Sequence, residues 1–253
     1  MRYPIAILTF ALGLLLSCKD DDKPTTGNNP ANNEHTNVQV GYGFIDVNGQ
    51  KAYVNSMFPV SATEQLRLRT NRMYLSNIAL RRADGTWWKE SNSYHLMEMP
   101  GRGIADPVFT LSRVPAGSYT AISFGFGVDS TMNRSVDKKG DLDPANGMAW
   151  DWNTGYRFLV MEGADQSDTA VVWHIGEAIN YRIKQETFAQ PWEVKVPAGS
   201  QASKLVATID ISKFLNGPVQ LTLADYRNVM FNRTATAKCA DNIIAAISIK
   251  PAP

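Results

Sequence analysis

The sequence predicts an all-β protein, a single-domain antiparallel β-sandwich that begins at about Val38 and continues to the C-terminus. Apolar side chains alternate with polar ones in several segments, and this period of two places each apolar set on one face of a strand. Asn-Gly and Asp-Gly dipeptides, which accept the positive φ of tight turns, begin at residues 48, 84, 146 and 216. About ten short strands without long intervening helices favour two packed sheets over an α/β fold. The clearest alternating sets are Val38, Val40, Tyr42 and Phe44; Ile122, Phe124 and Phe126; and Leu205, Ala207, Ile209 and Ile211.

Two segments depart from the strand pattern. Residues 62–70 and 225–232 are expected to form short helices between strands. No long stretch shows a convincing helical period, so helices are expected to contribute little to the core.

The first 17 residues have the three parts of a secretory signal peptide. Arg2 supplies the basic tip, an apolar run extends from Ile5 to Leu16, and the small residue Ser17 precedes Cys18. A membrane-spanning helix is the alternative. However, about twelve apolar residues reach only about 18 Å as a helix, whereas the hydrocarbon core of a bilayer is roughly 30 Å thick. Residues 1–17 are therefore expected to be a cleaved signal.

Cys18 directly after Leu-Leu-Ser resembles a lipobox, in which the cysteine receives a diacylglycerol thioether and becomes the mature N-terminus. An acylated Cys18 would anchor the chain to the lipid bilayer without a spanning segment. Residues 18–37 lack large apolar side chains and are expected to be a disordered tether, with the sandwich over residues 38–253. The acidic run at residues 20–22 resembles the signal that exports some lipoproteins to the surface of the outer membrane, although a solvated linker explains it equally well. The prediction is an outer-membrane lipoprotein that faces the periplasm or the cell surface.

Charge and cysteine content narrow the possible partners. The chain has 25 basic and 24 acidic residues, and loss of Arg2 with the signal leaves 24 of each. This balance favours neither nucleic acid nor an anionic bilayer as a partner. With Cys18 committed to lipid, Cys239 has no partner for an internal disulfide, and a buried, inert thiol is expected there rather than a metal ligand.

The sequence contains no familiar catalytic motif. It has no Gly-x-Ser-x-Gly, no His-Glu-x-x-His, no phosphate-binding glycine loop and no Cys-x-x-Cys. His35 falls in the expected tether, so a hydrolase that needs a histidine base would depend on His95 or His174. A binding protein is therefore expected rather than an enzyme.

Three motifs in the second half of the domain carry a family resemblance. They are Gly140-Asp141-Leu142-Asp143-Pro144, the Met-x-Trp-x-Trp-x-x-Gly-Tyr segment over residues 148–156, and His174-Ile175-Gly176. Taken in this order, and from about Val38 to the C-terminus, the chain resembles the MbnP-like family, the methanobactin-associated copper-binding proteins of the periplasm and cell surface. The resemblance implies an all-β copper-binding domain. In characterised relatives one tryptophan is oxidised to kynurenine by a partner di-haem enzyme, and copper is held by that residue together with histidine.

Carried onto this chain, the resemblance implies that Trp150 is the modified residue and His174 the imidazole ligand. Trp152 stands where some relatives have a histidine, so His95, Met148 or water would have to complete the copper site. The chemistry is plausible because an intact indole offers only an N–H donor, whereas ring opening yields an aromatic amine and a ketone. Copper accepts imidazole readily and, in the cuprous state, thioether as well.

Each of these residues also has a structural interpretation. Trp150 and Trp152 could pack in the core or at its rim, His174 could be a hydrogen-bonded residue near a strand end, and His95 could be a surface or core residue. A calcium loop is a further alternative, but its spacing misses the usual pattern, and a turn with Asx hydrogen bonds is favoured. The residues of that possible loop are Asp137, Asp141, Asp143 and Asn146.

The main alternative function is a surface-tethered glycan-binding or adhesive β-sandwich without a metal, and a third is a structural partner-binding module. In the glycan-binding protein, tryptophans would be the stacking platforms for sugar rings. The candidates are Trp87, Trp88, Trp150, Trp152 and Trp192.

Overall fold

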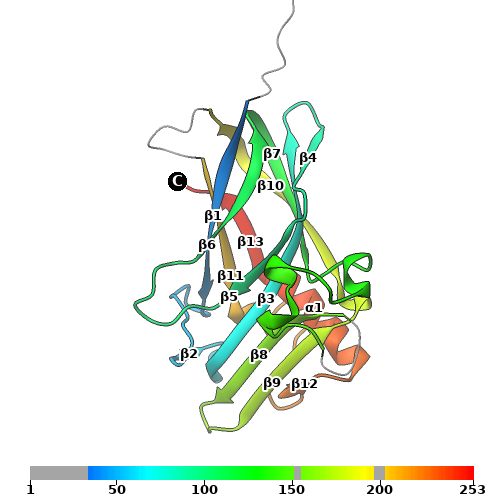
Figure 1. Cartoon of the computed structure of the whole chain (residues 1–253). Coiled ribbons are helices and arrows are strands. Elements are labelled where there is room, and N and C mark those ends of the chain that lie inside the picture. Colours follow the sequence, from blue (N-terminus) through cyan, green and yellow to red (C-terminus); the bar gives the residue numbers. More distant parts are fainter. Residues whose placement is uncertain (1–33, 151–154, 197–202) are drawn as a thin grey trace, which may run out of the picture. The chain divides into compact units, whose positions relative to one another are not determined.

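Two β-sheets form the domain in the computed structural model, which describes residues 34–150, 155–196 and 203–253 (Figure 1). The four-stranded sheet has the order β13-β11-β1-β6, and the main path of the nine-stranded sheet has the order β10-β7-β3-β8-β9-β12. The predicted β-sandwich is confirmed. The strands of the first sheet are β1 (His35–Ile45), β6 (Val108–Pro115), β11 (Lys204–Asp210) and β13 (Ile247–Pro251). Those of the second path are β3 (Gln65–Arg82), β7 (Gly117–Phe126), β8 (Arg157–Asp165), β9 (Ala170–Gly176), β10 (Arg182–Val194) and β12 (Asn228–Val229).

The alternating apolar sets fill the space between the sheets. Val40 and Phe44 of β1, Phe124 of β7 and Ile209 of β11 are almost completely buried, as the period of two predicts. Most strand pairs are antiparallel, but β1 pairs with β11 and β9 with β12 in parallel. Both sheets are therefore mixed rather than purely antiparallel.

The long strand β3 organises the nine-stranded sheet. One of its edges pairs with β8 over residues 66–73 and then with β7 over residues 75–82, and the pairing with β7 has an irregularity between Ser76 and Ala79. Its other edge pairs with β2 (Met57–Pro59), β5 (Tyr94–Glu98) and β4 (Trp87–Lys89). This strand thus connects the two halves of the sheet on which the sites described below lie.

Both predicted helices are wrong. Residues 65–70 belong to β3, because Leu66 and Leu68 alternate into the core. Residues 225–232 contain the short strand β12, and the helix α1 (Arg233–Ala246) begins only after Asn232. The Asn232 side chain caps that helix by accepting a hydrogen bond from the Ala235 amide at 3.0 Å.

The N-terminal boundary also differs slightly from the expected one. His35, assigned to the tether from the sequence, is the exposed first residue of β1 and pairs with Pro115 of β6. No helix among the described residues is long and apolar enough to cross a membrane.

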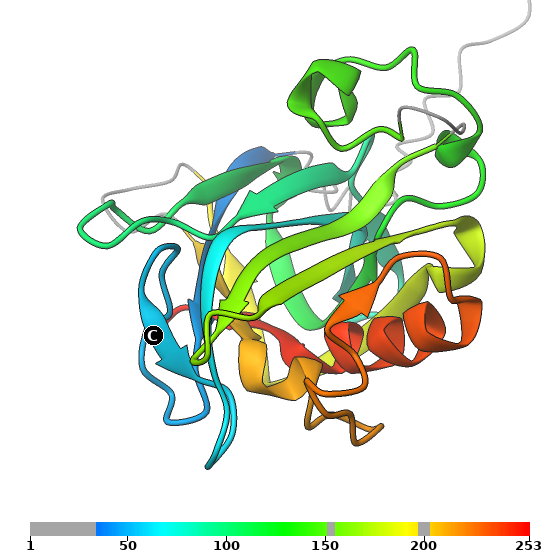
Figure 2. The same ribbon diagram turned by 90° about the horizontal axis from the view of Figure 1, so that it is seen from below.

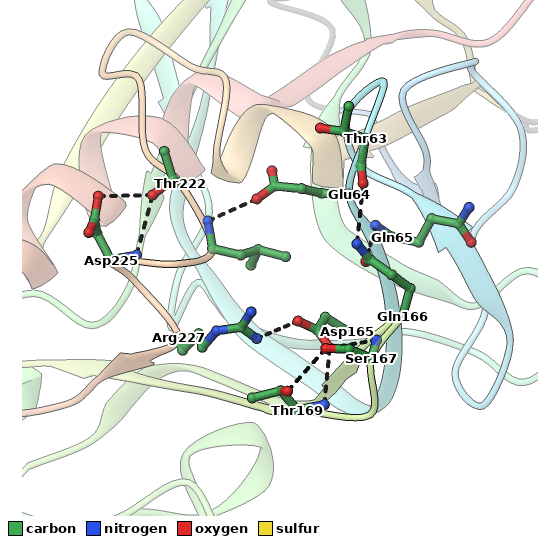
Figure 3. A network of polar contacts seen from close by, with 11 residues as sticks. Thr63, Glu64, Gln65, Asp165, Gln166, Ser167, Thr169, Thr222, Asp225 and Arg227 are labelled. Atoms are coloured by element: carbon green, nitrogen blue, oxygen red, sulfur yellow. Dashed lines mark hydrogen bonds and ion pairs between the residues drawn. The ribbon is translucent and has the colours of Figure 1, made fainter.

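A polar network fixes the turn between β8 and β9 to the start of β3 and to the segment before β12 (Figure 3). Asp165 Oδ1 accepts hydrogen bonds from the hydroxyl and amide of Ser167 and from the Thr169 amide, while its Oδ2 pairs with Arg227. The hydrogen bonds from Ser167, together with the Arg227 guanidinium, hold the pKa of Asp165 well below its ordinary value. The far end of the β8–β9 hairpin is thereby connected to both neighbouring segments.

Candidate metal site

A covering segment, residues 128–150, lies against β3, β8 and β9, and it contains the first sequence motif and the start of the second. It carries three short 3₁₀ helices, Met132–Arg134, Gly140–Leu142 and Pro144–Asn146. Figure 2 shows this segment and α1 on opposite sides of the β8–β9 hairpin. Arg72 donates a hydrogen bond to the Asn146 carbonyl at 2.6 Å, and Tyr74 and Tyr156 donate to the carbonyls of Asp141 and Leu142. Strand side chains thus hold the segment by its backbone.

The acidic residues of the covering segment build turns. Asp143 Oδ1 accepts a hydrogen bond from the Ala145 amide at 2.8 Å, and Asp141 Oδ2 accepts one from the Leu96 amide. Asn146 donates to the Gly140 carbonyl at 2.9 Å, and Gly147 follows in the left-handed region. The favoured interpretation, a turn with Asx hydrogen bonds, is therefore confirmed. Within the described part of the chain, no three His, Cys, Asp or Glu side chains lie together as a metal site would require.

Trp150, at the end of the covering segment, packs against His174 of β9. The two ring centroids are 6.4 Å apart with an interplanar angle of 64°. The Trp150 indole also lies against Gly176, where an added Cβ would fall 2.8 Å from Nε1. On β8, the Arg157 guanidinium lies 5.5 Å from the Trp150 ring centroid, a cation–π distance. The Met-x-Trp and His-Ile-Gly motifs therefore meet in space.

The His174 imidazole has one nitrogen engaged and one available. Its Nε2 lies 2.7 Å from Glu162 Oε1 on the neighbouring strand β8, and the His174 side chain is 12 % exposed. A carboxylate at this distance accepts a hydrogen bond from Nε2–H, and the lone pair of the neutral imidazole then lies on Nδ1. No partner for Nδ1 is found among the described residues. Metal-binding histidines have this arrangement, with one nitrogen on the metal and the other donating to a carboxylate.

A small cavity of about 20 Å³ adjoins Trp150 and Gly176, with Met230 and Asn180 in its wall. This volume suffices for one water molecule. Asn180 is almost completely buried, and its Nδ2 donates to the Gly176 carbonyl at 2.5 Å, whereas its Oδ1 has no hydrogen-bond partner in the described part of the chain. The indole therefore has an unused hydrogen-bond acceptor in the wall of the cavity beside it.

The other predicted site residues are His95, Met148, Trp152 and Cys18. His95 on β5 is separated from β9 by β3 and β8, roughly 14 Å across the sheet, so one ion cannot bind both histidines. The His95 ring stacks on Phe109, and its Nε2 lies 2.8 Å from Glu90. Met148 is completely buried in the hydrophobic core. Trp152 and Cys18 lie outside the described residues.

The expectation for Cys239 holds. This thiol is buried on α1, and burial raises its pKa to about 12, so it stays protonated and unreactive at neutral pH.

Sequence reasoning missed Glu162 and Arg157, the two charged residues that flank the Trp150–His174 pair. Glu162 gave no motif signal, because only strand pairing brings it beside a histidine 12 residues further along the chain. Arg157 lies directly after the Gly-Tyr of the second motif, but its contact with the indole depends on the fold of the covering segment.

The fold and the motif residues together define an all-β domain with a histidine–tryptophan pair on the outer face of a sheet. A sequence model of the MbnP family matches residues 29–232, and the chain belongs to this family. The structure of MbnP from Methylosinus trichosporium superposes with a TM-score of 0.55 at 15 % sequence identity, covering 87 % of this chain and all of that one. At that identity the likeness concerns the fold. A search of curated proteins found no match.

Proposed function

We propose that this protein binds copper at the cell envelope, with His174 as the imidazole ligand and an oxidised Trp150 beside it. The observation that carries the proposal is the pairing of these two rings, together with the Glu162 contact that leaves His174 Nδ1 available. An imidazole held in this way suits copper, which binds nitrogen ligands most strongly among the divalent first-row metals. Membership of the MbnP family supports a copper-related role.

The residues present fit copper only if Trp150 is converted into a metal ligand, because an intact indole has no lone pair to donate. We propose that cleavage of the indole C2–C3 bond with insertion of two oxygen atoms from dioxygen gives N-formylkynurenine, and that hydrolysis then releases formate and leaves kynurenine. A separate di-haem oxidase would catalyse the oxidation. The product carries an aromatic amine, and the unpaired Asn180 Oδ1 in the cavity beside Trp150 supplies an acceptor for one of its N–H groups.

The protein's own residues orient the site rather than perform a reaction. Glu162 fixes the imidazole tautomer, and Gly176 leaves room for the Trp150 side chain. Arg157 binds the Ala149 carbonyl at 3.1 Å and so positions the end of the covering segment. We accordingly propose a binding protein and not an enzyme.

The test measures how much copper the wild-type protein and two variants retain. Each full-length protein is purified from its native envelope and dialysed against copper of either oxidation state. The variant is His174→Ala, and the matched control is His95→Ala, since His95 is also paired with a glutamate. We expect loss of bound copper in the first variant only. Equal retention by His174→Ala and the wild type would overturn the proposal.

We further propose that the protein is an outer-membrane lipoprotein anchored through acylated Cys18. The sequence supports this through its short apolar run and the cysteine after Leu-Leu-Ser. The acidic run at residues 20–22 would direct it to the cell surface. Replacing the three aspartates with alanine should reduce protease accessibility on intact cells at unchanged protein abundance, and unchanged accessibility would leave the acidic run as a linker without a targeting role.

A further inference from the structure

A second cavity, of about 600 Å³, opens on the nine-stranded sheet and shares no lining residue with the cavity beside Trp150. Its volume lies in the range of small-molecule sites. It is bounded by β4 on one side, by the start of β10 on the other, and by the irregularity of β3 at Asn77. The protein thus has a cavity large enough for a small molecule, and the proposed copper function does not use it.

The hollow arises from small side chains flanked by large ones. Ser123 of β7 pairs with Ala79 of β3, which pairs with Lys89 of β4, so these three side chains project from one face of the sheet. The neighbouring Ile122 and Phe124 point into the core instead. Trp87, two residues before Lys89, forms one wall of the resulting trough. Ile183, which is 67 % exposed, belongs to the opposite wall.

One end of the trough is closed by a polar network around Asp129. One carboxylate oxygen accepts hydrogen bonds from Tyr94 and Asn77, and the other accepts the backbone amides of Thr131 and Met132. These hydrogen bonds outweigh the burial of Asp129 and lower its pKa. The carboxylate is therefore saturated by protein donors.

Tyr181 completes this end of the trough. Its hydroxyl accepts a hydrogen bond from Asn77 at 2.7 Å, and its own proton stays available. The ring lies so close to Gly125 that an added Cβ would fall 2.3 Å from the hydroxyl oxygen. Glycine at this position is thus what lets Tyr181 reach the trough.

Glu90 supplies a second carboxylate, of which one oxygen, Oε2, already has hydrogen-bond partners. Its Oε2 accepts a hydrogen bond from Ser93 at 2.5 Å and lies 2.8 Å from His95 Nε2, and its side chain is only 7 % exposed. No partner of Oε1 is found among the described residues, and the same holds for Ser123 Oγ, Lys89 Nζ and Asn77 Oδ1. The trough thus offers a ligand both hydrogen-bond acceptors and hydrogen-bond donors.

We propose that this trough binds a neutral, hydroxyl-rich ring of the pyranose sugar class. A sugar hydroxyl both donates and accepts, so it matches the mixture of Glu90 Oε1, Asn77 Oδ1 and Tyr181 O–H, while the C–H face of the ring packs on the Trp87 indole. A hard cation is disfavoured, because Asp129 is saturated and calcium needs six to eight oxygen ligands. An anion would face the carboxylates of Glu90 and Asp129.

The trough also modifies the glycan-binding alternative derived from the sequence. None of the described residues with a large, well exposed apolar side chain is a tryptophan. The described part of the chain therefore offers no fully exposed indole on which a sugar ring could stack. Trp88 and Trp192 pack against the hydrophobic core. Trp87 is the tryptophan that lines the trough.

Saturation-transfer NMR on the full-length protein tests this proposal, in a detergent without a sugar headgroup. The probes are glucose, galactose, mannose and N-acetylglucosamine with their β-linked disaccharides, and glycine serves as a zwitterionic comparison. Ser123→Leu fills the trough from its floor, and Thr110→Leu on the exposed face of β6 is its matched control. Trp87→Phe with Trp192→Phe forms a second pair.

We expect saturation transfer to at least one sugar, an affinity at least about tenfold lower in Ser123→Leu because its side chain occupies the site, and no change in Thr110→Leu. Trp87→Phe should weaken binding and Trp192→Phe should not. Binding of no sugar in the panel would overturn the proposal. So would undiminished binding by correctly folded Ser123→Leu, or a response to glycine alone.

Discussion

The contact between His174 Nε2 and Glu162 Oε1, at 2.7 Å, decides which imidazole nitrogen can bind a metal. Because the carboxylate accepts a hydrogen bond from Nε2–H, the lone pair of the neutral ring lies on Nδ1. The two residues come from paired strands, so the geometry is set by the sheet and not by a loop.

Glu162→Gln should therefore weaken copper binding without removing the ligand itself. A glutamine can present either its oxygen or its amide to Nε2, so the tautomer is no longer fixed, and outer hydrogen-bond partners of metal ligands are worth about tenfold or more in affinity. Competition with a chromophoric copper chelator measures the change. Glu90→Gln, which alters the equivalent pair at His95, is the control and should leave the affinity unchanged. Equal affinities for Glu162→Gln and wild type would contradict the assigned role.

Gly176→Ala should displace the Trp150 indole. The new methyl group would meet the Tyr156 carbonyl at 2.6 Å and Trp150 Nε1 at 2.8 Å, and overpacking of this kind costs about 1–3 kcal/mol. Denaturant unfolding measures the free energy, and copper binding should fall in parallel. The control is Gly43→Ala on β1, where no atom of the described residues lies within 4 Å of the added Cβ. If Gly176→Ala is as stable as Gly43→Ala, the described packing is wrong.

The sequence predicted the sandwich better than its irregular parts, for physical reasons. Strands such as β1 and β11 can be recognised from the alternation of apolar and polar residues, because one face of each strand is buried and the other is not. The helix α1 buries mainly small or polar side chains, among them Thr236, Ala240 and Asn242, so its apolar stripe is weak. Residues 62–70 looked helical because the charged residues around Leu66 and Leu68, which are Glu64, Arg67 and Arg69, suit either structure.

The site was predictable only in part. The motifs named Trp150 and His174, and the structure brings these two rings together. The sequence also suggested His95, whose distance from His174 follows from the order β5-β3-β8-β9 and cannot be read from residue spacing. Glu162 is a long-range strand neighbour with no local signal, and for that reason it was missed.

Asp165→Asn should reduce stability at neutral pH and flatten its dependence on pH in acid. Hydrogen bonds from Ser167 and the Arg227 guanidinium lower the folded-state pKa of Asp165 below the unfolded value of about 3.9. The stabilisation is thus complete above the unfolded pKa and is lost as the pH falls through the folded one. Acid unfolding followed by circular dichroism measures this. Asp168→Asn, at an exposed residue of the same turn, should behave like the wild type, and equal acid profiles for both variants would contradict the prediction.

Cys18→Ser should release the protein from membranes. The chain beyond the signal has balanced charges, so acyl chains are the expected anchor. Fractionation of cell envelopes, with extraction by high salt as a control for adsorption, measures the distribution. Pelleting of the variant with membranes after high-salt washing would indicate another anchor.

The most direct test of the copper site is pulsed electron paramagnetic resonance on full-length protein from the native envelope, loaded with Cu(II). A coordinated imidazole gives modulation from its remote nitrogen. We predict the signal of a single imidazole in the wild type and in His95→Ala, and its loss in His174→Ala. An unchanged imidazole signal in His174→Ala would contradict the assignment of His174 as the copper ligand.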